Sequence, residues 1–270
     1  MRSLRTWFFG FAVVVGIAGL AFIFFLRDRY VVPILSYHHV ASDFHSSKDF
    51  PSLNNVTAKS FAWQMKFIEK HGYHVISFED YIDGVKKGHG FARNTVVIQF
   101  DDGYEDNYTN AFPVLKSYEF PAMVFVISDT IGTPGFLTWA QIKEMDSQGF
   151  KIGAHTRRHA YLPEVPLEVA KEEIFGSKKA LEAGVGHPID YFAYPSGGFT
   201  EEVAGLVKQA GYKAAVTTNR GRDKFNRRFF EINRIRIKNT ENSLTLWAKL
   251  SGYYNFFRRP RCGDNCKDME

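Results

Sequence analysis

Two adjacent carboxylates and a later pair of histidines are the residues of this 270-residue chain best suited to do chemistry. Asp101 and Asp102 follow the apolar, β-branched run 96–100 and precede a glycine, which indicates a buried strand that ends in a tight turn. Burial of two neighbouring carboxylates is costly unless a cation lies beside them. His155 and His159 supply two imidazoles four residues apart. These groups could bind a divalent metal through one carboxylate and two histidines, and leave the other carboxylate for proton transfer.

Each motif also has a structural explanation. An Asp-Asp-Gly sequence after a strand is commonly a simple turn, and two histidines four residues apart are more often surface or packing residues than ligands. The joint occurrence of the two motifs after predicted strands of successive strand–helix units favours the catalytic interpretation.

The chain after residue 31 alternates short apolar strands with amphipathic helices. Strands are predicted at 31–37, 95–100, 122–127, 151–154, 191–194, 214–217 and 232–237, and helices at 60–71, 78–87, 107–118, 139–148, 167–183, 201–210 and about 243–250. Thr138 is a suitable N-cap for the helix at 139–148. Alternation at this spacing predicts a distorted (β/α) barrel of about seven parallel strands, with the polar motifs gathered at the C-terminal strand ends.

The first residues predict a membrane anchor. Residues 7–26 contain no charge and no proline, and as a helix they would span roughly 30 Å, the thickness of the bilayer core. We expect a short cytoplasmic segment at 1–6, a single transmembrane helix at 7–26, and an exported domain at 32–257 at the cell membrane. A cleaved secretory signal is the alternative, which the length of the apolar run disfavours.

Composition excludes some functions. The net charge of +5 is diffuse and no nucleic-acid-binding motif is present, so we expect no nucleic-acid partner. Neither a linker nor a repeat divides the domain. The two cysteines, Cys262 and Cys266, lie in a polar tail at 258–270, where an exported compartment permits a disulfide and a metal site is weakly indicated.

Several motifs, in order along the chain, resemble those of the polysaccharide deacetylases, also called NodB-homology or carbohydrate esterase family 4 enzymes. The resemblance covers roughly residues 32–240. Residues 99–103 are similar to the family's F-D-D-G motif, and residues 155–159 match its H-S/T-x-x-H pattern with Thr156 in the hydroxyl position. The other resembling segments are Tyr194–Gly197, Leu137–Trp139, and Pro33–Val40, the last similar to the start of the surface-attached poly-β-1,6-N-acetylglucosamine deacetylase branch.

The resemblance implies a role for each residue of the first two motifs. Asp102, His155 and His159 would bind a divalent metal, with zinc expected first, and Asp101 would act as general base toward the attacking water. Thr156 would brace the ligands.

The third and fourth motifs imply contacts with the substrate. The backbone N–H of Tyr194 would stabilise the oxyanion, Pro195 would shape the substrate loop, and Trp139 would stack on a sugar ring. Packing against the barrel core is the alternative for Trp139.

Two departures from the family pattern concern catalysis. Ala193 stands where classical members carry an arginine that tethers the catalytic aspartate, and Arg234 or Arg236 could replace it, although a solvent-facing position is the alternative for Arg234. Classical members also carry a C-terminal Leu-x-His that protonates the leaving amine. No histidine follows His187 here, and His38 is the candidate for that role.

These features together predict a membrane-anchored, metal-dependent hydrolase that removes N-acetyl groups from a cell-surface or cell-wall polysaccharide. An O-acetyl esterase and a catalytically weak, membrane-anchored glycan-binding protein are the alternatives. The sequence leaves open the polysaccharide, the metal in vivo, the pairing of the cysteines and the oligomeric state.

Overall fold

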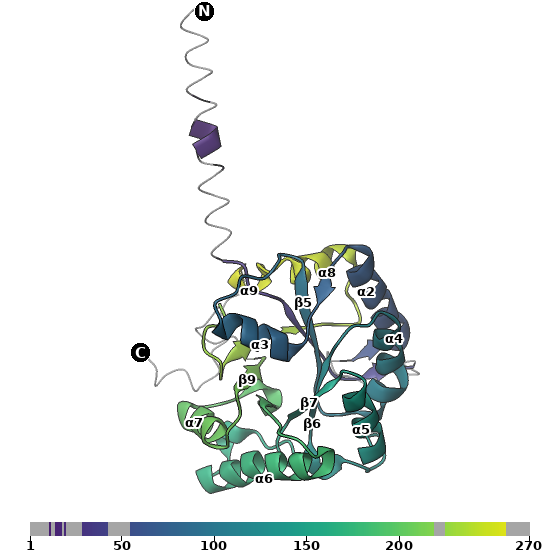
Figure 1. Ribbon diagram of the computed structural model, residues 1–270, viewed down its shortest axis with the longest axis vertical. Coiled ribbons are helices and arrows are strands. Elements are labelled where there is room, and N and C mark those ends of the chain that lie inside the picture. Colours follow the sequence, from purple (N-terminus) through teal and green to yellow (C-terminus); the bar gives the residue numbers. More distant parts are fainter. Residues whose placement is uncertain are drawn as a thin grey trace, which may run out of the picture.

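A computed structural model describes residues 11, 14–17, 19, 29–42, 55–218 and 225–257. These residues include a core of parallel strands surrounded by helices (Figure 1). Most of the predicted anchor, the segment 1–6, the tail 258–270 and both cysteines lie outside the described residues. Within the described part, no helix is both long enough and apolar enough to span a bilayer.

The strands and helices follow the predicted alternation. The strands are β1 (Ile34–Tyr37), β2 (Val40–Ala41), β3 (Val56–Thr57), β4 (His74–Val75), β5 (Thr95–Phe100), β6 (Met123–Val126), β7 (Lys151–Ala154), β8 (Tyr191–Ala193), β9 (Ala214–Thr217), β10 (Ile232–Asn233) and β11 (Ile235–Arg236). The helices are α2 (Ala58–Lys70), α3 (Phe78–Lys86), α4 (Phe112–Ser117), α5 (Trp139–Ser147), α6 (Leu167–Val185), α7 (Glu201–Gln209), α8 (Ser243–Leu250) and α9 (Tyr254–Phe257). Short turns of helix, η1 (Asn107–Ala111), η2 (Ser128–Thr130), η3 (Leu162–Glu164) and η4 (Pro195–Gly197), lie in the connections.

The sheet closes on itself through an interrupted strand. Its order is β10-β9-β8-β7-β6-β5-β1-β11, and all of these pairings are parallel. β10 pairs with β9 and β11 pairs with β1, while only Arg234 separates β10 from β11. The segment 232–236 therefore joins both edges of the sheet. Counted as one strand, it brings the described barrel to seven positions, as predicted.

Alternate residues of each strand serve two different cores. One cluster lies inside the barrel and the other lies between the strands and the surrounding helices. The inner cluster includes Val97, Phe125, Tyr191 and Val216, and α3 adds Phe78 and Ile82 to it. α3 contacts strand residues near the N-terminal strand ends, since Phe78 packs edge-on against Tyr191 at 5.0 Å. The opposite, C-terminal end of the barrel is left for polar residues.

Local sequence signals set the helix boundaries. Thr138 begins α5 as predicted, because its hydroxyl accepts a hydrogen bond from the Gln141 N–H and the Gln141 side chain bonds back to Thr138. The predicted helix at 107–118 instead begins as the π-helical turn η1 and continues as α4. Pro113 lies in the first turn of α4, where the missing N–H of proline disturbs the regular hydrogen-bond ladder.

Close packing inside the barrel predicts that a substitution at Gly153 lowers the stability of the protein. Gly153→Ala should destabilise the protein by about 1–3 kcal/mol, because its methyl group would lie 2.4 Å from Phe125 Cδ1 inside the barrel. Gly205→Ala on α7 is the matched control. No atom lies within 4 Å of its added methyl group, so this change should stabilise the helix by about 0.5–1 kcal/mol. Urea unfolding of both variants measures the difference, and wild-type stability of Gly153→Ala would contradict the described packing.

Candidate functional site

Asp101 and Arg234 form a buried, bidentate ion pair at the C-terminal end of the barrel. Arg234 Nη1 lies 2.6 Å from Asp101 Oδ1, and Arg234 Nη2 lies 2.7 Å from Asp101 Oδ2. Both side chains are almost completely buried. Burial is the largest single effect and raises the pKa of Asp101, but the Arg234 guanidinium, together with His155 and His38, outweighs it and holds the pKa below the usual range. The pair therefore keeps this carboxylate ionised and fixes its orientation.

Asp102, His155 and His159 converge beside this pair. Asp102 Oδ1 lies 3.3 Å from His155 Nε2 and 3.4 Å from His159 Nε2, and one ligand atom from each residue falls within 4.8 Å of the others. Burial is the largest single effect and raises the pKa of Asp102, but His155, together with His38 and His159, outweighs it and keeps the pKa well below its usual range. The predicted one-carboxylate, two-histidine group is therefore assembled in space.

The hydrogen bonds around the group suit a divalent metal. His155 Nδ1 lies 2.7 Å from the carbonyl oxygen of Ala193, so that nitrogen carries the proton and Nε2 remains as the ligand atom. Asp102 Oδ1 is buried and accepts no hydrogen bond from any described residue. Two imidazole nitrogens and one carboxylate oxygen form a donor set typical of catalytic zinc sites. The residues present therefore fit the metal.

Left-handed backbone conformations after β5 and β7 orient the side chains of the carboxylate–histidine group. Asp102 follows β5 with φ of 71°, and Thr156 and His159 follow β7 with φ of 63° and 61°. Non-glycine residues rarely adopt this conformation, so neighbouring contacts must hold it. One such contact is the hydrogen bond from the His159 N–H to the Thr156 hydroxyl, at 3.0 Å. Thr156 thus takes the bracing position predicted for it.

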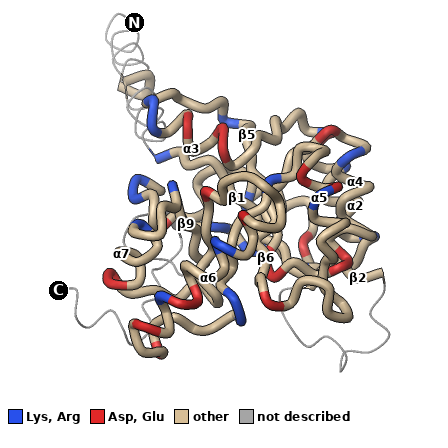
Figure 2. The backbone as a smooth tube through the Cα atoms, turned by 60° about the horizontal axis from the view of Figure 1, so that its bottom comes forward, with Lys and Arg blue, Asp and Glu red and all other residues tan. Residues whose placement is uncertain are grey.

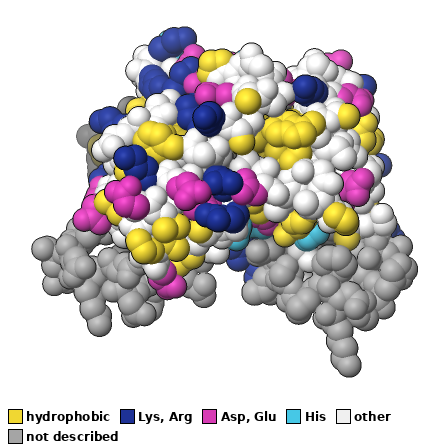
Figure 3. All heavy atoms as spheres, turned by 90° about the horizontal axis from the view of Figure 1, so that it is seen from below, with side chains coloured by type: hydrophobic (Ala, Val, Ile, Leu, Met, Phe, Trp, Pro, Cys, Tyr) yellow, Lys and Arg dark blue, Asp and Glu magenta, His cyan; other side chains and the backbone are white. Residues whose placement is uncertain are grey.

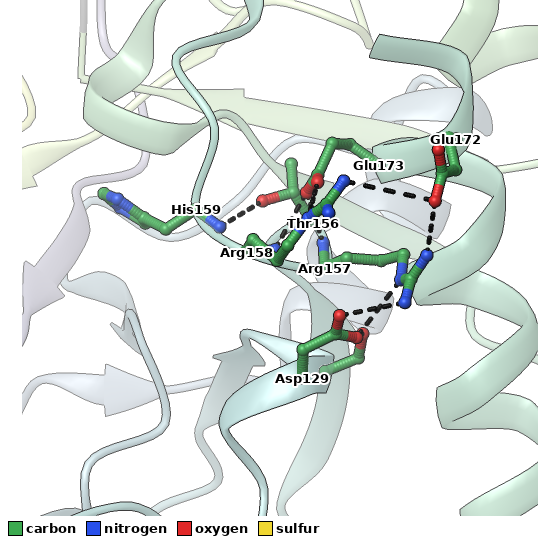
Figure 4. A network of polar contacts seen from close by, with 8 residues as sticks. Asp129, Thr156, Arg157, Arg158, His159, Glu172 and Glu173 are labelled. Carbon is green, nitrogen blue, oxygen red and sulfur yellow. Dashed lines mark hydrogen bonds and ion pairs between the residues drawn. The ribbon is translucent and has the colours of Figure 1, made fainter. Parts of the chain in front are cut away.

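The loop between the two histidines is also held from α6 and η2 (Figure 4). Arg157 and Arg158 both donate their backbone N–H groups to the Glu173 carboxylate, at 2.9 and 2.8 Å. The Arg157 guanidinium contacts Asp129 and Glu172. The segment that carries both histidines is consequently fixed by charged groups from neighbouring elements.

An open pocket of about 140 Å³ lies over the ion pair and the histidines. Its lining consists of His38, Asp101, Asp102, His155, His159, Tyr194, Ser196, Gly197, Thr218, Arg234 and Arg236. His38 Nε2 lies 3.7 Å from Asp101 Oδ2. Burial lowers the pKa of His38 below the ordinary histidine value, although Asp101 opposes this effect. His39 is not part of the lining, and it instead bonds Asp106 and stacks on Tyr104.

The oxyanion role predicted for Tyr194 is wrong. Its backbone N–H donates to the Val216 carbonyl oxygen at 3.1 Å, because the ladder between β8 and β9 continues one residue beyond β8. The next residues of the pocket lining are Ser196, with φ of 54°, and Gly197. Pro195 is buried in the turn that presents them, but it does not line the pocket.

Trp139 does not reach the pocket either. Its ring packs against α6, where a methyl group on Gly184 would lie within 2.0 Å of it. The alternative interpretation, core packing, is therefore the one observed for Trp139. Tyr161 is an exposed aromatic residue beside the pocket loop, and its ring lies against Gly198.

Comparisons with known proteins agree with this geometry. The family model described as polysaccharide deacetylase matches residues 89–215. YxkH of Bacillus subtilis (strain 168), whose name places it among the polysaccharide deacetylases, is 31% identical over 206 residues, which cover 76% of this chain and 71% of YxkH. A poly-β-1,6-N-acetyl-D-glucosamine N-deacetylase of Staphylococcus aureus is 27% identical over 202 residues, which cover 66% of this chain and 69% of that protein.

Solved structures show the same fold. The deacetylase PplD of Streptococcus pyogenes, in complex with acetate, superposes with a TM-score of 0.75 at 29% identity and covers 81% of this chain and 97% of its own. BC0361, a polysaccharide deacetylase from Bacillus cereus, superposes with a TM-score of 0.70 at 30% identity over 81% of this chain and 68% of its own. With its ordered motifs, its barrel and its carboxylate–histidine site, this chain belongs to the polysaccharide deacetylase family.

Proposed function

We propose that this protein is a metal-dependent hydrolase that removes N-acetyl groups from a cell-surface or cell-wall polysaccharide. The observation that carries the proposal is that two adjacent carboxylates have different partners, which suit different roles. Asp102 stands with two histidines as a ligand group, whereas Asp101 is held apart by Arg234 as an ionised base. A protein that only binds glycans has no use for the second carboxylate in this state.

The metal would contribute one kind of chemistry. Held by Asp102, His155 and His159, a divalent ion such as Zn²⁺ would polarise an acetyl carbonyl and would lower the pKa of water to about 7. The protein's own groups do the rest. Asp101 accepts the proton of the attacking water, and Arg234 keeps Asp101 ionised and in one orientation.

Two further steps need groups from the pocket. His38 is the imidazole of the lining that remains once His155 and His159 are assigned as ligands, and its Nε2 lies 3.7 Å from Asp101 Oδ2. We propose that His38 passes the proton that Asp101 takes from water on to the leaving amine. The backbone N–H of Ser196 replaces the Tyr194 amide as the candidate for oxyanion stabilisation, because Ser196 lines the pocket, whereas the Gly197 N–H donates to the Tyr194 carbonyl oxygen at 2.9 Å.

The substrate class comes from chemistry and from the relatives. The Staphylococcus aureus relative acts, by its name, on poly-β-1,6-N-acetyl-D-glucosamine, and we propose a polymer of that type. Basic and acidic side chains are interspersed along the chain and on the face seen from below, which suits an uncharged polymer better than a nucleic acid (Figures 2 and 3). The apolar sequence at 7–26 supports a location at the cell membrane, with this domain on the exported side.

Acetate release is the direct test of the proposed function. Full-length protein should release acetate from β-1,6-linked N-acetylglucosamine oligomers faster than from chitin oligomers or peptidoglycan, and a chelator should abolish the reaction. Release only from O-acetylated glycans would support the esterase alternative. Binding of glycan without acetate release, at full metal occupancy, would support the glycan-binding alternative.

The proposed metal site at Asp102, His155 and His159 predicts the zinc content of the protein and of its variants. Full-length protein should bind about one equivalent of zinc, and His159→Ala should lose most of it, because two ligands hold zinc far less tightly than three. His74→Ala, which changes an exposed histidine of β4, is the matched control and should keep the wild-type content. Metal analysis after dialysis measures both. Full occupancy in His159→Ala would remove that residue from the site.

Asp101→Asn separates the base from the ligands. The change keeps the shape of the side chain but removes the proton acceptor, so kcat should fall by about 10²–10⁴ while zinc content stays at the wild-type level. Loss of zinc from this variant would show that the two aspartates have exchanged roles.

His38→Gln tests the proton donor to the leaving group. We expect kcat for an N-acetylated glycan to fall by about 10²–10⁴, because an amine must be protonated as it leaves. Hydrolysis of 4-nitrophenyl acetate should change much less, because its phenolate leaves without a proton. An equal loss on both substrates would assign His38 a structural or binding role.

A further inference from the structure

A buried carboxylate on α6 holds the loop that carries both histidine ligands. Glu173 is 1% exposed, and its Oε2 accepts the backbone N–H groups of Arg157 and Arg158, at 2.9 and 2.8 Å. Its Oε1 accepts Arg158 Nε at 2.6 Å. Figure 4 shows the carboxylate pointing from α6 toward this loop. Glu173 is part of neither the pocket lining nor the carboxylate–histidine group.

The carbonyl groups of the same loop are bound from the opposite side. The Ser128 N–H donates to the Thr156 carbonyl oxygen at 3.2 Å, and the Asp129 N–H donates to the Arg157 carbonyl oxygen at 3.0 Å. The peptide groups between the two histidines are therefore held between η2 and α6. The two N–H groups that face α6 converge on one oxygen atom of Glu173.

This arrangement matters because the loop is strained. Thr156 and His159 both have left-handed backbone, which side chains other than glycine disfavour. A carboxylate that accepts two successive N–H groups stabilises the turn in which both point the same way. Without that anion, two partly buried N–H groups would lose their acceptor, and the loop would favour a conformation that turns His159 away from Asp102.

We propose that Glu173 is the positioning residue that sets the metal affinity of the site, by holding the loop between His155 and His159 in its binding geometry. The inference rests on the metal site of the proposed function and deepens it. Glu173 contributes no ligand atom, so its effect is transmitted by the backbone of Arg157 and Arg158 alone. The exposed side chain of Arg158 contributes little to the effect.

Zinc affinity, measured by competition with a chromogenic chelator on full-length protein, tests the proposal. Glu173→Gln should raise the zinc Kd about 10–100-fold, the usual effect of losing a group that orients metal ligands. Glu172→Gln is the matched control on the same helix, since Glu172 is exposed and bonds only arginine side chains. It should change the Kd by less than about threefold. Arg158→Ala should also stay near the wild-type Kd, because it keeps both backbone bonds.

A stability control separates positioning from general destabilisation. Leu181→Ala removes a fully buried side chain farther along α6 and should lower Tm without changing the zinc Kd. A Kd for Glu173→Gln equal to that of Leu181→Ala would overturn the proposal. If Glu173→Gln does not fold, Glu173→Asp carries the same test, because the shorter carboxylate keeps the charge but cannot reach all three donors. Failure of the wild-type protein to bind zinc would instead refute the proposed metal site itself.

Discussion

Burial of two neighbouring carboxylates at the end of one strand is the constraint on which the site depends. Asp101 and Asp102 both follow β5, but their backbone conformations differ, so their carboxylates point toward different partners. Asp101 points into the barrel and meets Arg234 on the closing strand, whereas the left-handed turn at Asp102 redirects its carboxylate toward His155 and His159. The different backbone conformations of two adjacent residues thus create a base and a ligand. Loss of a buried partner such as Arg234 would cost about 3–5 kcal/mol, a large part of the net stability of a domain.

The same end of the barrel concentrates backbone strain. Asp102, Thr156, His159 and Ser196 are all left-handed residues other than glycine, and each costs about 1–3 kcal/mol. Hydrogen bonds from outside the turns offset this cost. Thr217 of β9, for example, donates its hydroxyl to the Gly197 carbonyl oxygen at 2.6 Å and so holds the turn after β8. The strands supply a rigid frame, and four of the six left-handed residues other than glycine in the described chain lie in the turns that follow β5, β7 and β8 at this end.

Local patterns predicted the order of the elements and the candidate metal-binding group, because hydrophobic periodicity and short motifs are properties of adjacent residues. The partner of Asp101 was left open, since it lies 133 residues away and depends on how the last strand joins the first. The Tyr194 N–H was misassigned because the residues around Tyr194 do not indicate that the hydrogen bonds between β8 and β9 continue one residue past β8. Trp139 was misassigned as well, because the glycine of α6 that receives its ring is distant in sequence. The predicted anchor lies largely outside the described residues and stays a prediction.

The position of Arg234 on the closing strand has a consequence for biosynthesis. Ribosomes build the chain from its N-terminus, so Asp101 and the three ligand residues are all made before residue 232. A nascent chain at that stage has an open sheet, with neither β9 nor β1 joined to its last neighbour, and no guanidinium faces Asp101. Assembly of the catalytic base therefore coincides with closure of the barrel. A truncated product that stops short of this strand would carry the recognisable motifs of a deacetylase without the charge pairing that its base requires.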